Sequence, residues 1–322
     1  MTSADTSSQS ESTGTTAAPP VAAPGKRKYP ILSLLTCAVC VIVFFGLASE
    51  QKQDSWEVFS KWGFLPADEI RQGKLWALVS SVFVHQALWH LVFNVYWLFV
   101  LGAPLERAVG SVRWLGLFVS AALVSSAAEL TVSDTTGIGA SGVVYALFGF
   151  MWVTRKRYSG FERLLDPRTI LIFIVWLIGC VIASVTGVWS VGNAAHISGL
   201  LLGVGCAAWV LFVQRRRLIG LVLAILTLLS FIGFFWAPWS ADWTSSRAVR
   251  AHANGDYSSA IRSYQRALKL GQDKVWCWEN MTLVYYSMGD TNRYHEALET
   301  LRQIDAVAAK KLEAEISTPS TK

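Results

Sequence analysis

Charged residues are scarce in this chain of 322 residues, since Asp, Glu, Lys and Arg together make up only 16% of its positions. Apolar residues make up 53%, Trp occurs 15 times, and the mean hydropathy is +0.40. Ordinary soluble domains carry about 25% charged residues. The composition therefore excludes a soluble globular protein and predicts a multi-pass membrane protein whose main surroundings are the lipid bilayer.

Cysteine is sparse and poorly placed for a disulfide framework. Of the five cysteines, Cys277 stands alone in the C-terminal region. The other four lie inside apolar runs, where cysteine behaves as a small apolar side chain: Cys37, Cys40, Cys180 and Cys206. No disulfide pairing is therefore predicted.

Two further features of the sequence limit the cofactors and partners that we expect. A His-Glu-x-x-His motif is missing, and no carboxylate accompanies His85, His90 and His196 in the membrane, so we expect no metal ion and no other cofactor. The net charge of +6 comes from short basic clusters beside apolar runs, which is the pattern of topology signals. We therefore expect no nucleic-acid partner.

The N-terminal residues 1–29 are predicted to form a disordered cytoplasmic tail, because residues 1–25 contain almost no large apolar side chain. Lys26, Arg27 and Lys28 then precede the apolar run 31–48. This pattern also fits a signal peptide that ends at residues 46–48. The long leading region favours a retained membrane anchor.

Seven apolar stretches follow one another along the chain, most of them close to the roughly 20 residues that a spanning helix needs. The second stretch is too long, and its first third is predicted to be an interfacial segment before a helix that starts near Leu88. The stretches are 31–48, 75–101, 114–130, 137–153, 169–186, 194–213 and 218–236.

Basic residues alternate between the connecting segments and predict the orientation. They precede the first stretch and follow the second, fourth and sixth, whereas residues 131–136 and 187–193 contain no Lys or Arg. Short basic loops favour the cytoplasm. We expect a cytoplasmic N-terminus and a C-terminal domain outside, in a bacterial inner membrane.

Polar side chains of three predicted helices then fall at one depth near the outer face. If the fourth helix enters at residue 137, Ser141 lies roughly 6 to 8 Å along it, and His196 lies a similar distance into the sixth helix. Alone, Ser141 fits close helix packing, and His196 fits a packing histidine. Their occurrence at one depth favours a nucleophile and its base.

The neighbouring residues suit this chemistry. His90 and Asn94 share one face of the second helix and, with the Ser141 N–H, would donate to an oxyanion. Tyr145 would support the His196 ring, and Gly199 with Gly203 would let the two helices approach. Glu129 and Asp134 are expected at the exposed outer edge, so the prediction is a Ser-His dyad without a third member.

These residues resemble the rhomboid family of intramembrane serine proteases, over about residues 75–213. The resemblance implies Ser141 as nucleophile, His196 as general base, and His90, Asn94 and Ser141 at the oxyanion hole, with Glu106 bracing the loop after the second helix. One departure is Trp76-Ala77, where the family often has Trp-Arg. The resemblance implies that this arginine is structural, so its absence is expected to affect the rigidity of the loop before the second helix more than catalysis. The matching motifs are His85-x4-His90-x3-Asn94, Leu105-Glu106 through Gly110-Ser111, Gly139-Ala140-Ser141-Gly142 with Tyr145, and Ala195-His196-x-x-Gly199-x-x-x-Gly203.

The region after the last stretch has a repeat. Gly255-Asp256 and Gly289-Asp290 are 34 residues apart, which is the period of tetratricopeptide repeats. Ala260, Tyr264 and Ala267 fit the second helix of one repeat, and Trp278, Tyr285 and Ala297 resemble another. The alternative is a pair of amphipathic helices packed on themselves or on the membrane surface.

The expected architecture is an all-α polytopic membrane protein. It comprises a six-helix rhomboid core at 30–214, a seventh transmembrane helix at 215–238, a tetratricopeptide-like helical domain at 239–311 and a disordered tail at 312–322. The expected function is endoproteolysis within or beside the membrane helix of single-pass membrane proteins, with a peptide or protein partner at the C-terminal domain. The alternative is a catalytically weak relative that binds client helices.

Overall fold

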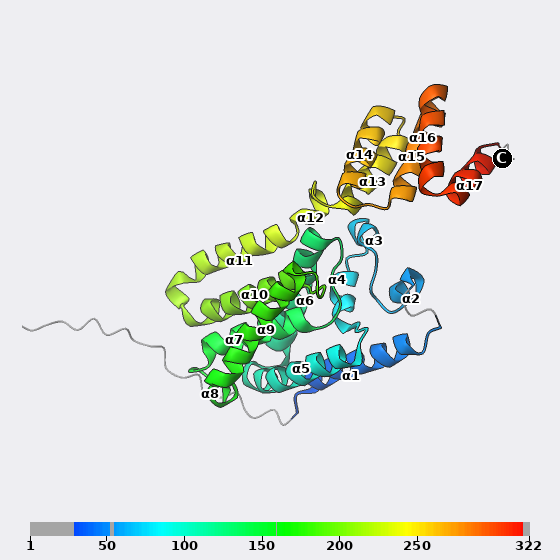
Figure 1. Cartoon of the computed structure of the whole chain (residues 1–322). Coiled ribbons are helices and arrows are strands. Elements are labelled where there is room, and N and C mark those ends of the chain that lie inside the picture. The colour runs from blue at the N-terminus through cyan, green and yellow to red at the C-terminus, as the bar shows by residue number, and fades with distance from the viewer. Residues whose placement is uncertain (1–28, 52–54, 159, 318–322) are drawn as a thin grey trace, which may run out of the picture.

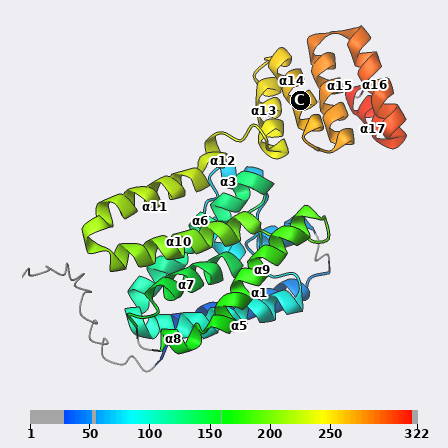
Figure 2. The same cartoon turned by 60° about the vertical axis from the view of Figure 1, so that its left-hand side comes forward.

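The computed structural model describes residues 29–51, 55–158 and 160–317, and these contain helices and no strand (Figures 1 and 2). Six segments are long and apolar enough to cross a membrane, judged by length and composition. Most of the predicted cytoplasmic tail lies outside the described residues, as do Lys26, Arg27 and Lys28. The six segments are α1 (Ile31–Ala48), α5 (Leu88–Val109), α6 (Ser111–Ser133), α9 (Pro167–Val185), α10 (Asn193–Leu211) and the stretch Val213–Phe235.

The remaining predicted span is α7 (Ser141–Thr154), which has only 14 residues. At about 1.5 Å per residue it covers roughly 21 Å, less than the roughly 30 Å bilayer core. The predicted start at residue 137 is wrong because Gly137 and Gly139 have φ angles of 68° and 93°, which a right-handed helix does not allow. Ser141 is therefore the first residue of α7. The helix packs inside the bundle against α10, α6 and α5 (Figure 1).

Helix α5 begins at Leu88, as predicted, after the short helices α4 (Ala77–Ser80) and η1 (Ser81–Phe83). It continues beyond the predicted end at residue 101 and stops at Val109, where Gly110 turns the chain with φ 87°. The extra turns carry Glu106 to the start of α1. Its carboxylate accepts hydrogen bonds from the N–H groups of Leu32 and Ser33 at 3.2 and 2.8 Å. Glu106 also accepts from Ser111 Oγ at 2.7 Å, so it joins α1 as well as the following connection.

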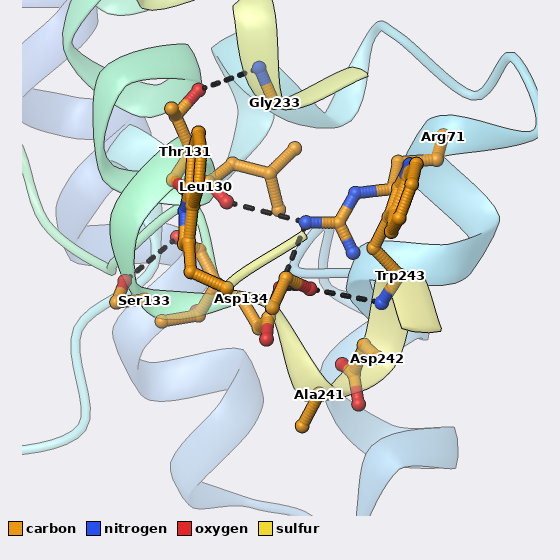
Figure 3. A network of polar contacts seen from close by, with 12 residues as sticks. Arg71, Leu130, Thr131, Ser133, Asp134, Gly233, Ala241, Asp242 and Trp243 are labelled. Atoms are coloured by element: carbon orange, nitrogen blue, oxygen red, sulfur yellow. Dashed lines mark hydrogen bonds and ion pairs between the residues drawn. The ribbon is translucent and has the colours of Figure 1, made fainter. Parts of the chain in front are cut away.

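The predicted helix at 218–236 is two helices, α11 (Arg216–Ser230) and α12 (Ile232–Phe235), which follow the 3₁₀ turn η2 (Val213–Arg215). The break is stabilised from α6. Thr131 Oγ1 donates to the Ser230 carbonyl at 2.7 Å. It also accepts from the Gly233 N–H at 3.2 Å (Figure 3). The Thr131 hydroxyl thus pairs with a carbonyl and an N–H that would be paired within a continuous helix.

The C-terminal helices form a separate group beyond α12 (Figures 1 and 2). An acceptor side chain caps the start of each of α13 to α16, contributed by Ser240, Asp256, Asp273 and Asp290. The helices are α13 (Ala241–Ala253), α14 (Tyr257–Lys269), α15 (Lys274–Met288), α16 (Thr291–Ile304) and α17 (Ala306–Ser317).

The predicted disordered tail at 312–322 is wrong for residues 312–317, which belong to α17. Ala309 and Leu312 of α17 are buried against Leu298 and Leu301 of α16, so apolar contact across the pair stabilises the last helix. Residues 318–322 lie outside the described part of the chain. Ala260, Tyr264 and Ala267 are buried on α14, the second helix of the group.

A polar junction joins this group to the membrane helices (Figure 3). Arg71, at the end of α3 (Ala67–Arg71), pairs with Asp134 at 2.8 Å just after α6, and Ser240 at the start of α13 donates to the same carboxylate. Trp239 Nε1 donates to the Thr131 carbonyl at 2.7 Å. The last turn of α6 therefore holds both α12 and α13. Two short helices complete the fold, α2 (Trp56–Lys61) and α8 (Phe161–Leu164).

Candidate active site

Ser141 and His196 meet at one end of the bundle. Ser141 begins α7, and His196 lies in the first turn of α10. His196 Nε2 is 2.8 Å from Ser141 Oγ, which is hydrogen-bonding distance. His196 is 4% exposed, whereas Ser141 is half-buried and lines a cavity. The two residues that the sequence placed at one depth are thus in direct contact.

Small residues make this contact possible. A Cβ atom at Gly199 or at Gly203 of α10 would overlap the carbonyl oxygen of Gly142 or of Ala146 on α7. A Cβ at Gly142 would come within 2.6 Å of Ser125 Oγ on α6. The backbones of α7 and α10 therefore approach more closely than side chains would permit, as the smooth glycine face predicts.

Gly139 brings the loop before α7 beneath two histidines. A Cβ at Gly139 would lie 2.6 Å from Cε1 of His90 and 3.3 Å from Nε2 of His85. His85 is fully buried, its Nδ1 lies 3.1 Å from the Phe83 carbonyl, and its ring centroid is 5.0 Å from that of His90. Burial, and then the neighbouring His90, lower the pKa of His85, so its ring is neutral and serves to pack against His90.

Asn94 and Tyr145 lie beside the dyad. Asn94 Nδ2 donates to the His90 carbonyl of its own helix at 2.9 Å, and both residues line the cavity that contains Ser141. The Tyr145 ring contacts the His196 ring with centroids 4.8 Å apart and a 37° tilt. Its hydroxyl donates to the Phe173 carbonyl of α9 at 3.1 Å. Tyr145 is thereby fixed against the imidazole, although the contact is tilted and not a parallel stack.

The cavity over Ser141 has a volume of about 480 Å³ and extends between α5 and α9. Aromatic pairs bridge these two helices on one side. Phe93 and Trp176 have ring centroids 4.9 Å apart, and Trp97 and Phe173 have centroids 4.7 Å apart. An apolar segment of chain that reaches Ser141 between these helices would first have to separate these rings.

Part of this chain is similar to proteins of a known family. Residues 72–214 match the Rhomboid domain. It is 36% identical over 180 residues to Rhomboid protease GlpG of Serratia proteamaculans, 33% to that of Pectobacterium atrosepticum and 31% to that of Yersinia enterocolitica. Each alignment covers 55% of this chain and 61 to 62% of the relative. The comparisons support the rhomboid family, and the chain spans less than two thirds of each relative.

The part of the chain that matches this domain contains a buried carboxylate that the sequence analysis misplaced. Glu129 is only 5% exposed, and its carboxylate accepts from the Ala195 N–H of α10 at 3.1 Å and from Ser133 Oγ at 2.8 Å. The prediction of an exposed outer edge is therefore wrong. Asp134 is also partly buried, in its pair with Arg71. A carboxylate inside an apolar helix is itself a signal of function, and it was the signal available for Glu129.

Three histidines lie in the matched region, His85, His90 and His196. Among the described residues, no group of three or more His, Cys, Asp or Glu side chains is arranged to hold a metal ion. The arrangement instead offers a hydroxyl, an imidazole in contact with it, and N–H donors nearby. This set is suited to acyl transfer.

Proposed function

We propose that this chain is an intramembrane serine endopeptidase in which Ser141 is the nucleophile and His196 the general base. The observation that carries the proposal is the 2.8 Å separation between His196 Nε2 and Ser141 Oγ within a rhomboid domain. Three relatives are named rhomboid proteases, which supports the same activity. A serine hydroxyl becomes a nucleophile when a neutral imidazole removes its proton.

In the proposed reaction, Ser141 Oγ attacks the scissile carbonyl carbon and its proton passes to His196 Nε2. The resulting oxyanion collapses, the peptide C–N bond breaks, and His196 returns the proton to the leaving amine. Water then attacks the acyl-enzyme, with His196 again accepting a proton and passing it to Ser141 Oγ as the ester bond breaks. The proton that leaves with the amine is thus replaced by one from the water, and the dyad returns to its starting state.

Donors for the oxyanion come from two helices. The Ser141 N–H is among the first four of α7, which have no acceptor within their own helix and lie at its positive end. The side chains of His90 and Asn94 on α5 line the same cavity. In a site shielded from water, losing one such donor costs about 3 to 4 kcal/mol of barrier.

The proposed substrates are single-pass membrane proteins cut within or beside their spanning helix. A helix hides its carbonyls in intrahelical bonds, so the substrate must unwind locally before Ser141 can reach one. The apolar helices and the bacterial relatives support a multi-pass protein of the inner membrane. We place the N-terminus in the cytoplasm and the active site near the outer face, because basic residues occupy the opposite loops.

Cleavage of a model single-pass substrate by the purified protein in liposomes tests the proposal. We expect Ser141→Ala and His196→Ala each to lower kcat by about a thousandfold or more. Ser198→Ala is the matched control, because that hydroxyl donates to the Ala194 carbonyl of its own helix at 2.6 Å and should leave activity near wild type. Undiminished cleavage by Ser141→Ala would reject the proposal.

We further propose that the C-terminal helices form a tetratricopeptide-like module that binds a peptide or protein outside the cytoplasm. The repeated Gly-Asp pairs support this, because Gly255 and Gly289 both turn the chain with φ near 70°, at 75° and 70°, and Asp256 and Asp290 cap the next helices. A photoreactive residue at the exposed position Tyr286 tests it. Cross-links to the extramembrane segment of a cleaved client are expected, and their absence would argue against client binding.

A further inference from the structure

The helix that carries His196 begins without a cap of its own. The residue before α10 is Gly192, so no side chain at that position accepts from the first N–H groups of the helix. Those groups require acceptors from elsewhere. His196 lies in this same first turn, so whatever fixes the turn also fixes the imidazole.

Glu129 of α6 provides such an acceptor from a different helix. Its Oε2 accepts from the Ala195 N–H at 3.1 Å, and its Oε1 accepts from Ser133 Oγ at 2.8 Å. The side chain also packs beside Gly137, where a Cβ would lie 3.5 Å from Glu129 Cγ. A buried carboxylate is tolerated only where hydrogen bonds and favourable charge compensate its lost hydration, and the N-terminus of a helix offers both.

The other side of the imidazole lacks a polar partner. His196 Nδ1 is buried and makes no hydrogen bond with the described residues. Its orientation therefore depends on the backbone of α10 and on the ring contact with Tyr145. Because Ala195 directly precedes His196, a shift of the Ala195 N–H is transmitted to the base without any intervening side chain.

We propose that Glu129 is a positioning residue for His196. Glu129 caps α10 across the helix interface and thereby holds the imidazole within reach of Ser141. This inference rests on the proposed function. Glu129 does not contact the reacting atoms; it acts through the backbone of α10. It should therefore affect kcat and leave KM nearly unchanged.

Three substitutions of Glu129 separate the effect of side-chain length from the effect of charge. Glu129→Gln keeps the length and one acceptor oxygen, Glu129→Asp keeps the charge but withdraws it by a methylene group, and Glu129→Leu removes the acceptor. Since misplacing a catalytic group by about 1 Å can cost about a hundredfold, we expect kcat to fall about 10- to 100-fold for Asp and Leu and within about threefold for Gln. Ser133→Ala is the matched control, because it removes the donor to Oε1 and keeps the Glu129 carboxylate that accepts from the Ala195 N–H.

Hydrogen exchange of residues 193–197 in the purified variants gives a readout that does not depend on activity. Faster exchange in Glu129→Leu and Glu129→Asp, with wild-type protection in Glu129→Gln, is the expected result. Equal exchange in all variants would overturn the proposal that Glu129 caps α10. So would a kcat that is retained in Glu129→Asp and lost in Glu129→Gln. If Glu129→Leu does not fold, the Gln and Asp pair decides alone.

The two proposals fail in different ways. If the wild type cleaves no substrate and Ser141 does not react with a serine-directed fluorophosphonate, the proteolytic function fails, while the exchange data still show whether Glu129 caps α10. If the wild type cleaves and Glu129→Leu retains its kcat, the function stands and the positioning role is rejected.

Discussion

At the scale of one residue, Gly199 decides whether serine and histidine can meet. A Cβ at this position would overlap the Gly142 carbonyl oxygen, so Gly199→Ala must push α10 away from α7. We expect Gly199→Ala to lower the stability by about 1 to 3 kcal/mol, typical of overpacking, and to reduce kcat because the Ser141–His196 distance grows. Thermal unfolding in detergent and substrate cleavage measure the two effects.

Gly116 of α6 supplies the matched control, because a Cβ there meets no atom within 4 Å. Gly116→Ala adds the same methyl group to a helix interior without a clash, and alanine is the better helix former. Its unfolding temperature should equal or exceed that of the wild type. If both variants behave alike, close approach of the backbones is not what Gly199 provides.

At the scale of the helices, sequence patterns locate the apolar segments but not where each one ends. Hydropathy places α1, α9 and α10 and the start of α5 because lipid-facing residues must be apolar whatever they contact. The extra turns of α5 carry Glu106 to Ser33 of α1 before Gly110 ends the helix, and the break before α12 depends on Thr131 of α6. Such contacts join distant parts of the chain and leave no local pattern.

The candidate site shows the same division. Ser141 and His196 could be paired because each lies near the start of an apolar segment that follows a loop without Lys or Arg. Glu129 was placed at an exposed edge because its burial depends on the N-terminus of α10 packing over it, which no local property of residues 114–130 encodes. The buried carboxylate becomes interpretable only once its acceptor role is visible.

Glu106 allows a test of an element-level contact that is separate from catalysis. It lies 16 residues beyond His90 on α5, or about 24 Å along the helix axis, and it joins the start of α1. We expect Glu106→Leu to leave the N–H groups of α1 unpaired and to cost about 1 to 3 kcal/mol. The unfolding temperature should fall while kcat per folded molecule stays within about twofold of the wild type. Ser111→Ala removes one of the hydrogen bonds to Glu106, so its unfolding temperature should lie between those of the wild type and Glu106→Leu. A selective loss of kcat in Glu106→Leu would contradict this structural role.

At the scale of the whole molecule, the last turn of α6 connects the C-terminal helices to the active site. Asp134 binds Arg71 of α3 and Ser240 of α13, and Glu129 lies five residues earlier on the same helix against α10. Displacement of α13 would therefore act on the segment that leads directly to Ser141. The junction also gathers acidic side chains, since Asp68 and Asp242 line the cleft beside Arg71.

We expect the attachment of α13 at this junction to depend on pH. Burial, and then the charge of Asp134, raise the pKa of Asp242 above its ordinary value. A carboxyl group whose pKa is higher in the folded state stabilises folding while protonated and loses that contribution as the pH rises through its titration range. We expect Asp242→Asn, which is neutral at every pH, to slow hydrogen exchange in α13 relative to the wild type at pH 7, with the difference shrinking towards pH 4.

Asp256 provides a comparison of opposite sign, because hydrogen bonds from Ser259 lower its pKa. Asp256→Ala should therefore speed exchange in α14 at pH 7. Faster exchange in Asp242→Asn at pH 7 would show instead that the ionised carboxylate holds α13 in place.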